Sequence, residues 1–178
     1  MKRLIMCEGP NELEVVRILL ENDALIFGED ELLGLTPYHA RQIGTNTQVQ
    51  IALRIYPGND ILVMRIGDKQ SDKLAIPAEF KEKMTGVEKY CTKPELEMLL
   101  IIAEGLVSEF EKTKSTVSPK EFAKANIRCG RRKYDNKSSF YREYFGNDVC
   151  RLTSSIHEYK RIRGSHKKDE LYLADLLK

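Results

Sequence analysis

The chain has 178 residues, of which 42% are hydrophobic and 31% are charged, and its formal net charge is +2. A chain of this length can bury most of its apolar surface in one domain, with or without a small appendage. No stretch approaches the roughly 18 apolar residues of a membrane span, and the apolar run after Met1 is too short for a signal peptide. We therefore expect a protein of the cytoplasm without a membrane segment.

The first predicted element is a strand over residues 2–7, a short apolar run without polar alternation. Such a run is typical of a strand buried on both faces of a parallel sheet. A helix should follow over about 10–22, because Pro10 suits a first helical turn and apolar residues recur behind it at helical spacing. The strand therefore ends directly before the string Glu8-Gly9-Pro10-Asn11-Glu12.

A short strand is expected over 24–27, and the glycine- and proline-containing stretch 28–44 predicts a loop. A second helix should cover about 46–55, and a second apolar strand should cover 60–66. Strand and helix alternate in this order. The alternation predicts an α/β fold with an open, mainly parallel sheet flanked by helices.

The second half of the chain is predicted to be helical. One long helix should run over about 94–112, beginning at Pro94, and another should open at Pro119. The tail has helical patterns over about 149–162 and 168–177.

Charge is distributed unevenly along the chain. Residues 1–111 hold 12 Lys and Arg against 19 Asp and Glu, whereas residues 112–142 hold 10 against 2. The net charges are −7 and +8, and residues 143–178 carry +1. An acidic body followed by a basic segment indicates an anion-binding extension. We therefore predict a domain over 1–111 and a basic helical extension over 112–178 that packs on it.

Acidic side chains follow both strands. Glu8 comes directly after the first strand and Asp68 shortly after the second. In open α/β sheets ligands bind beyond the carboxyl ends of the strands, so these carboxylates can converge on one hard cation, Mg²⁺ or Mn²⁺. Glu12 and Asp72 each come four residues later and could reach the same ion. The alternatives are that all of them are solvated, or that the glutamates only stabilise the helix dipole.

This combination resembles the Toprim domain, the metal-binding core of topoisomerases, primases and OLD-type nucleases. The matching features are an apolar strand before Glu8-Gly9, a helix opening at Pro10, and a second apolar strand before Asp68. The string from Glu8 to Glu12 looks most like the EGxxE of OLD-like and small stand-alone members, and the resemblance covers roughly the first hundred residues. It implies a metal-dependent nuclease or nickase acting on nucleic acid. It also implies that Glu8 and Asp68 are catalytic, with acid/base duty for Glu8.

One spacing departs from the family. The second Toprim motif is usually Asp-x-Asp, whereas Asp68 and Asp72 are four residues apart. Side chains at this spacing share a face only if a helix begins at Gly67 or Asp68. The different spacing affects whether the two aspartates can bind a second metal ion. It favours the alternative of a catalytically degenerate module that binds nucleic acid or a partner protein.

Glu95 is a further candidate metal ligand. It follows Pro94 at the start of the long predicted helix and lies along its apolar side. A carboxylate that points inward there needs a partner, and a metal ion or a basic residue would serve. Glu97 aligns with Glu104 and is expected to face solvent.

Basic residues are candidates for phosphate contacts. Lys69 and Lys73 flank the two aspartates, where they either clamp a phosphate or balance nearby acids. The run 112–142 is interleaved with aromatic residues that could stack on bases, and its candidate contacts are Arg128, Arg131, Arg132 and Lys133. The alternative is that these aromatics form the core of a small helical subdomain and the charges form its solvated face.

Other site classes find no support in the sequence. None of the four cysteines has Cys-x-x-Cys spacing, which fits reduced thiols rather than a zinc site. There is no G-x-x-x-x-G-K-[ST] phosphate loop. OLD-like proteins usually pair their Toprim domain with an ATPase, so the resemblance implies a separate ATPase or another protein partner. Whether the chain is an enzyme stays open at this point.

Overall fold

The computed structural model describes residues 1–68, 73–92, 95–162 and 171–178. Its centre is a five-stranded sheet in the order β2-β1-β3-β4-β7, and every neighbouring pair is parallel. The strands are β1 (Lys2–Cys7), β2 (Tyr38–His39), β3 (Ile61–Gly67), β4 (Met84–Cys91) and β7 (Leu171–Tyr172). The expected α/β fold with a parallel sheet is therefore confirmed.

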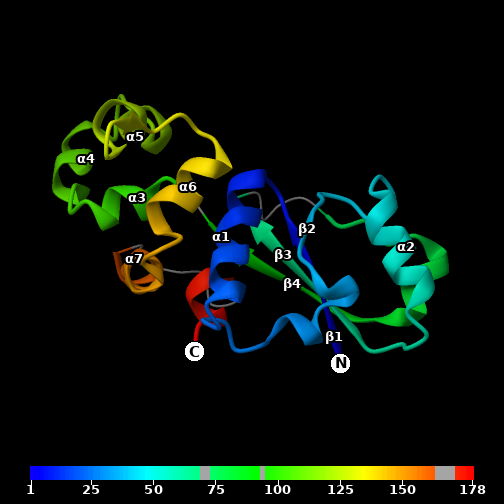
Figure 1. Cartoon of the computed structure of the whole chain (residues 1–178). Coiled ribbons are helices and arrows are strands. Elements are labelled where there is room, and N and C mark those ends of the chain that lie inside the picture. The colour runs from blue at the N-terminus through cyan, green and yellow to red at the C-terminus, as the bar shows by residue number, and fades with distance from the viewer. Residues whose placement is uncertain (69–72, 93–94, 163–170) are drawn as a thin grey trace.

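Helices cover both faces of the sheet, with α2 on one side and α1, α6 and α7 on the other (Figure 1). The helices are α1 (Pro10–Glu21), α2 (Thr47–Ile55), α3 (Met98–Ala103), α4 (Val107–Thr113), α5 (Pro119–Asn126), α6 (Ser138–Phe145) and α7 (Val149–Ile162). Short 3-10 turns are η1 (Glu29–Glu31), η2 (Leu33–Leu35), η3 (Ala78–Lys83) and η4 (Leu173–Leu176). A two-stranded antiparallel hairpin joins β5 (Arg128–Cys129) and β6 (Arg132–Lys133).

The two central strands form where the apolar runs predicted them. The last four residues of β1 are each at most 1% exposed, because both faces of the sheet are covered there. Cys7 pairs with Ile66 on β3, and the amide of Glu8 donates to the Ile66 carbonyl at 2.9 Å. This register places Glu8 beside Gly67 at the carboxyl edge of the sheet.

Local end signals fix several helices. Pro10 occupies the first turn of α1, and the Asn46 side chain accepts from the Val49 amide at 3.0 Å to cap α2. Ser118 and Glu121 form a reciprocal capping box at α5. The predicted helices near 10–22, 46–55 and 149–162 are accordingly confirmed.

Three predicted elements differ in the structure. The segment 24–27 is no strand, since only Leu25 forms an isolated bridge, to Leu177. The long helix breaks into α3 and α4 at Gly105, whose φ of 70° is incompatible with a continuous right-handed helix. The described part of 168–177 is not an α-helix, because β7 pairs there with the end of β4 before a 3-10 turn.

The strands β2 and β4 were not predicted. In β4 the exposed Thr85 and Val87 alternate with partly buried residues, so the strand lacks a continuous apolar run. Its place between β3 and β7 comes from pairing with strands elsewhere in the chain. Local pattern alone carried little signal for it.

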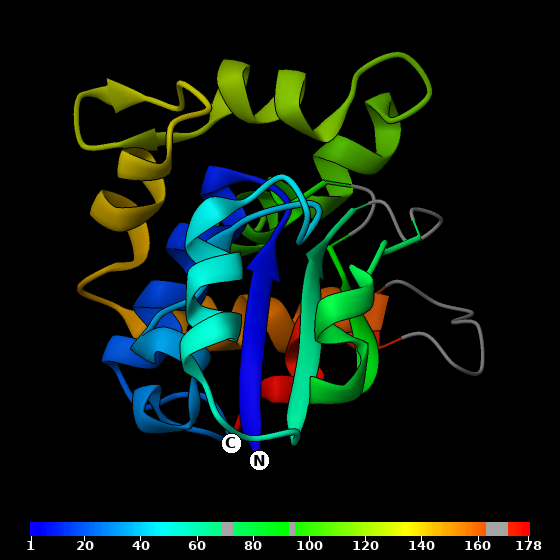
Figure 2. The same cartoon turned by 90° about the vertical axis from the view of Figure 1, so that its right-hand side faces the viewer.

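The segment from α4 to α6 lies across the carboxyl ends of the central strands (Figure 2). α6 is held against α1 by Arg142, which forms ion pairs with Glu14 and Glu21. The end of the chain returns to the sheet as β7, so the predicted extension 112–178 also contributes a strand to the sheet. The domain boundary between residues 111 and 112 stays a prediction. No helix within the described ranges is long and apolar enough to span a membrane.

Candidate acidic site at the sheet edge

A cavity of about 230 Å³ opens at the carboxyl edge of the sheet. Its walls come from the first turn of α1, from Asp68 after β3, and from the segment just before α3. The helical extension contributes two further residues, Lys120 and Asn136. Elements that are far apart in sequence therefore share one cavity.

Several carboxylates gather around this cavity. Glu12, Asp68, Glu95 and Glu97 line it. Burial raises the pKa of Glu12 above its ordinary value of 4.5, and the negative charges of Glu8, Asp68 and Glu97 raise it further. The charges of Glu8, Asp68 and Glu97 thus act on Glu12. That Glu8, Glu12 and Asp68 bind one cation stays a prediction.

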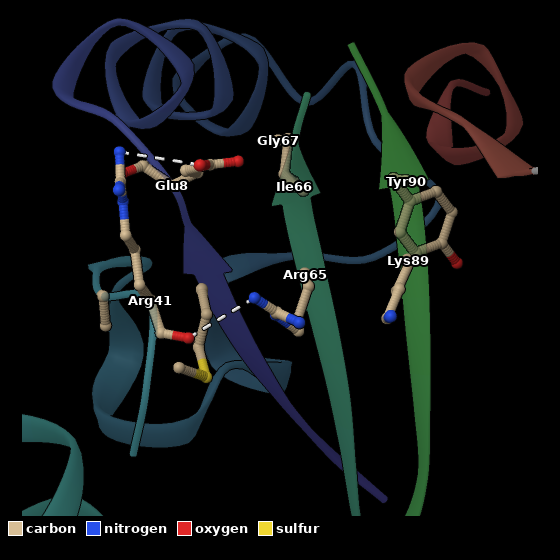
Figure 3. Close-up of a pocket in the computed structure, with 9 residues that line it drawn as sticks. Glu8, Arg41, Arg65, Ile66, Gly67, Lys89 and Tyr90 are labelled. Carbon is tan, nitrogen blue, oxygen red and sulfur yellow. Dashed lines mark hydrogen bonds and ion pairs between the residues drawn. The ribbon is translucent and has the colours of Figure 1, made fainter. Parts of the chain in front are cut away.

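Glu8 stands at the border of the cavity rather than in its wall. Its side chain is 14% exposed, and Arg41 Nη2 lies 3.5 Å from its Oε1 (Figure 3). The Nε of Arg41 also donates to the Glu8 carbonyl at 3.4 Å. Arg41 therefore fixes both the backbone and the carboxylate of Glu8.

Two glycines make room for the glutamates. A Cβ on Gly67 would lie 2.7 Å from the Cβ of Glu8 and 2.5 Å from its Oε2. A Cβ on Gly9 would lie 2.6 Å from Oε2 of Glu12. The clash at Gly67 involves the stem of the Glu8 side chain, so the Glu8 carboxylate has its present position only because residue 67 has no side chain.

Glu97 is buried, and the expectation that it faces solvent is wrong. It is only 3% exposed, and its Oε1 accepts the Tyr134 hydroxyl proton at 2.6 Å. The helical phase that aligned it with Glu104 does not apply, because α3 begins at Met98. Before it the chain makes a tighter turn, in which the Met98 amide donates to the Glu95 carbonyl at 3.2 Å.

Glu95 was expected to bind a metal ion or a basic side chain, but its partner in the structure is a backbone amide. Its Oε2 accepts the backbone N–H of Lys120 at 2.8 Å, in the first turn of α5. This contact satisfies the partly buried carboxylate through a helix N-terminus. It also holds α5 against the edge of the sheet.

An amide pair missed by the sequence analysis closes one side of the cavity. Asn11 Nδ2 donates to Asn136 Oδ1 at 3.2 Å, across 125 positions of sequence. Asn136 has a φ of 61°, a left-handed conformation that Asn adopts more readily than most residues. The buried Oδ1 of Asn11 has no hydrogen-bond partner in the part of the chain that the structure describes. No local sequence pattern indicates that Asn136 contacts Asn11.

No group of three or more Asp, Glu, His or Cys side chains in the described ranges is arranged to hold a metal ion by itself. Asp72 and Lys69 lie outside those ranges, so the second carboxylate and its neighbouring lysine stay predictions. Mg²⁺ keeps several waters and commonly uses only one or two carboxylates. The oxygen-only donor set around the cavity fits a partly hydrated ion of this kind.

The predicted nucleic-acid contacts that fall within the described residues lie at the surface and do not line the cavity. Arg128, Arg131 and Lys133 are exposed on or beside the hairpin, and Lys73 is exposed after β3. Arg132 is engaged with other side chains, since its guanidinium binds Asp135, Ser139 and Glu143. Their contact with nucleic acid stays a prediction.

The aromatic residues near these charges form a core. Each is at most 7% exposed, and the rings pack on one another: Tyr134, Phe140, Tyr141, Tyr144 and Phe145. The idea that they are available for stacking on bases is therefore wrong. The alternative, a packed aromatic core under a charged surface, describes this segment.

Comparison with known proteins identifies no relative: no family model, no curated protein and no solved structure matches this chain.

Proposed function

We propose that this chain carries out metal-dependent phosphodiester chemistry on nucleic acid, as a nuclease or nickase of the Toprim or OLD type. The observation that supports it is the gathering of Glu12, Asp68 and Glu97 around one cavity, next to Glu8, at the carboxyl edge of a parallel sheet. Ligand sites of open α/β sheets form at this edge.

The charge of the cavity favours a cation. Burial raises the pKa of Glu12 most, the negative charges of Glu8, Asp68 and Glu97 raise it further, and a bound cation would offset their repulsion. The buried Oδ1 of Asn11 is an acceptor without a partner among the described residues, and such atoms point to a bound water or ion. The cavity of about 230 Å³ far exceeds the roughly 10–15 Å³ that one water needs.

Asp68 and Glu12 would hold the ion, with Glu8 at the border of the cavity. The ion, Mg²⁺ or Mn²⁺, would orient the scissile phosphate and acidify a water molecule. Glu8 would exchange a proton with the reacting oxygen, and Arg41 keeps its carboxylate oriented. Tyr134 and the Lys120 amide hold Glu97 and Glu95 in the wall, so these two glutamates shape the cavity.

A second candidate function is a catalytically degenerate module that binds nucleic acid or a partner protein, such as a separate ATPase. The observation that favours it is that Glu95 and Glu97 both accept hydrogen bonds from the protein itself. Two of the acids at the cavity are thereby engaged without any ion.

Thermal melting in Mg²⁺ or Mn²⁺ tests the metal. A ligand that binds only the folded state at 100 times its Kd stabilises it by about 2.7 kcal/mol, or about 5–10 °C for a chain of this size. Asp68→Asn and Glu12→Gln should abolish this shift. Glu109→Gln, an exposed carboxylate on α4, is the matched control and should keep it. A wild-type protein that no divalent ion stabilises would contradict the metal site.

Cleavage assays separate the two candidate functions. We expect the wild type to nick supercoiled plasmid or cleave single strands in Mn²⁺, and Glu8→Gln and Asp68→Asn to lose this activity while remaining folded. Binding without cleavage in the wild type would support the degenerate module. Cleavage that survives in both variants would place the chemistry elsewhere.

A further inference from the structure

The segment from α4 to α6 places one buried hydroxyl against a side chain that lines the acidic cavity. Tyr134 follows β6 directly, and its hydroxyl donates to Oε1 of Glu97 at 2.6 Å. Both side chains are 3% exposed, so water has little access to this hydrogen bond. The two residues are 37 positions apart in sequence, so the contact joins the covering segment to the edge of the sheet.

Several contacts fix the position of Tyr134. Its backbone amide donates to the Ile127 carbonyl at 3.1 Å, beside the hairpin of β5 and β6. Its ring packs edge-to-face on Phe140 and Tyr141, with centroid distances of 5.2 and 5.9 Å. The Tyr141 hydroxyl also lies 3.4 Å from the Tyr134 hydroxyl. The aromatic core therefore holds this hydroxyl toward Glu97.

Glu97 can serve two partners at once. Its side chain lines the acidic cavity together with Glu12 and Asp68, and its negative charge acts on Glu12. A buried carboxylate costs free energy unless it is hydrogen-bonded and its charge is balanced. A carboxylate has two oxygens, and Tyr134 engages Oε1. Glu97 can thus accept the hydroxyl proton through one oxygen and meet a cation through the other.

We infer that Tyr134 is a positioning residue of the cation site and that it acts through Glu97. Its hydrogen bond holds the Glu97 carboxylate at the cavity, where the second oxygen stabilises Mg²⁺ or Mn²⁺. Side chains that hydrogen-bond a metal-binding carboxylate orient it in this way. The inference rests on the proposed function and deepens it, because it makes the covering segment a part of the cation site.

Mn²⁺ titration followed by electron paramagnetic resonance tests this role without a cleavage assay. Tyr134→Phe keeps the ring and removes the hydroxyl, and the loss of such a supporting hydrogen bond typically weakens metal binding about 10- to 100-fold. The spectrum of the bound Mn²⁺ should change as well, because it reports the arrangement of the groups around the ion. Circular dichroism at the same temperature checks that each variant is folded.

Tyr144→Phe is the matched control. Tyr144 is also a buried tyrosine of the covering segment, and its hydroxyl also donates to a glutamate, Glu104. Glu104 does not line the acidic cavity. The control should therefore keep the Mn²⁺ affinity and the spectrum of the wild type.

A double-mutant cycle shows whether Tyr134 acts through Glu97. Glu97→Gln removes the charge but keeps an oxygen for the Tyr134 hydroxyl, and it should also weaken Mn²⁺ binding. Tyr134→Phe added to Glu97→Gln should weaken binding little further, because the two changes remove the same interaction. Tyr134→4-aminophenylalanine restores an N–H donor and should recover most of the affinity, whereas a defect in ring packing would not be rescued.

The outcomes separate this inference from the proposed function. If the wild type binds Mn²⁺ with the expected loss in Tyr134→Phe but never cleaves nucleic acid, the positioning role stands and the catalytic proposal fails. If Tyr134→Phe binds Mn²⁺ like Tyr144→Phe, or if Glu97→Gln leaves the affinity unchanged, the inference is overturned while the cation site stands. Equal losses from Tyr134→Phe in the wild type and in Glu97→Gln would overturn it too. A wild type that binds no Mn²⁺ would overturn both the inference and the cation site.

Discussion

The fold raises the pKa of one residue at the site, Glu12. Burial raises its pKa first, and the charges of Glu8, Asp68 and Glu97 add to the effect. At neutral pH an ionised Glu12 therefore costs folding free energy unless a cation is bound. Such a residue ties the stability of the protein to the occupancy of its site.

Replacement of Glu12 by Gln should show this cost. The folded state binds more protons than the unfolded state between pH 4.5 and the raised pKa, so wild-type stability should fall as pH rises through that interval. In EDTA, Glu12→Gln should be more stable than the wild type at pH 7, and the difference should vanish below pH 4.5. Urea unfolding over pH 4–8 measures it, with Glu109→Gln as the control. A variant that is less stable than the wild type at neutral pH would contradict the electrostatic account.

Strand ends and short turns decide the geometry of the site at the scale of single elements. β1 and β3 bring Glu8 and Gly67 together, and the tight turn before α3 directs Glu97 inward. The hairpin and the residues after it supply Tyr134 and Asn136. Each of these elements is held by contacts outside itself.

Gly67→Ala should disturb the end of β3. The new Cβ would collide with the Cβ of Glu8 at 2.7 Å, and overpacking of this kind typically costs about 1–3 kcal/mol. We expect a lower melting temperature and a weaker Mg²⁺ response, because Glu8 must move. Gly86→Ala on β4 is the control, since its Cβ would meet only Leu62 Cδ1 at an ordinary 3.5 Å. Equal behaviour of the two variants would show that Gly67 is not needed for the position of Glu8.

Tyr134→Phe should destabilise the contact between α3 and the hairpin. The change removes the hydroxyl that donates to the buried Glu97, and hydrogen bonds to charged groups contribute about 1.5–3 kcal/mol. Tyr144→Phe is the control, because its hydroxyl donates to Glu104, whose side chain is 34% exposed and can be solvated. Urea unfolding should therefore show a larger loss for Tyr134→Phe than for Tyr144→Phe.

In the whole molecule, a basic segment lies over the acidic carboxyl edge of the sheet. The first 111 residues carry −7 and the segment 112–142 carries +8, and α4 to α6 lie over the carboxyl ends of the strands. Part of that positive charge is used internally, since Arg142 and Arg132 pair with acids of the protein. The exposed cations lie both on or beside the hairpin, as Arg128, Arg131 and Lys133, and elsewhere in the segment, as Lys112, Lys124 and Lys137.

Arg131→Gln/Lys133→Gln should weaken nucleic-acid binding without changing the metal response. Both side chains are exposed, so the fold should tolerate the change. The salt slope for duplex DNA should become less negative by about 1.8, or 0.9 for each lost phosphate contact, with the same loss for unrelated sequences. Anisotropy at several salt concentrations measures this. A slope that does not change would leave the hairpin as a solvated or protein-binding surface.

Local patterns in the sequence predicted β1, α1, α2, β3 and α7, together with the position of Glu8 after one strand and Asp68 after another. These features depend on local causes, namely continuous apolar runs, the proline at a helix start and helical spacing of buried residues. Long-range packing sets the pairing of β4 and β7, the burial of Glu97 against Tyr134, and the contact of Asn11 with Asn136. Those arrangements join residues 37 to 125 positions apart, and their stability comes from partners that no local pattern contains.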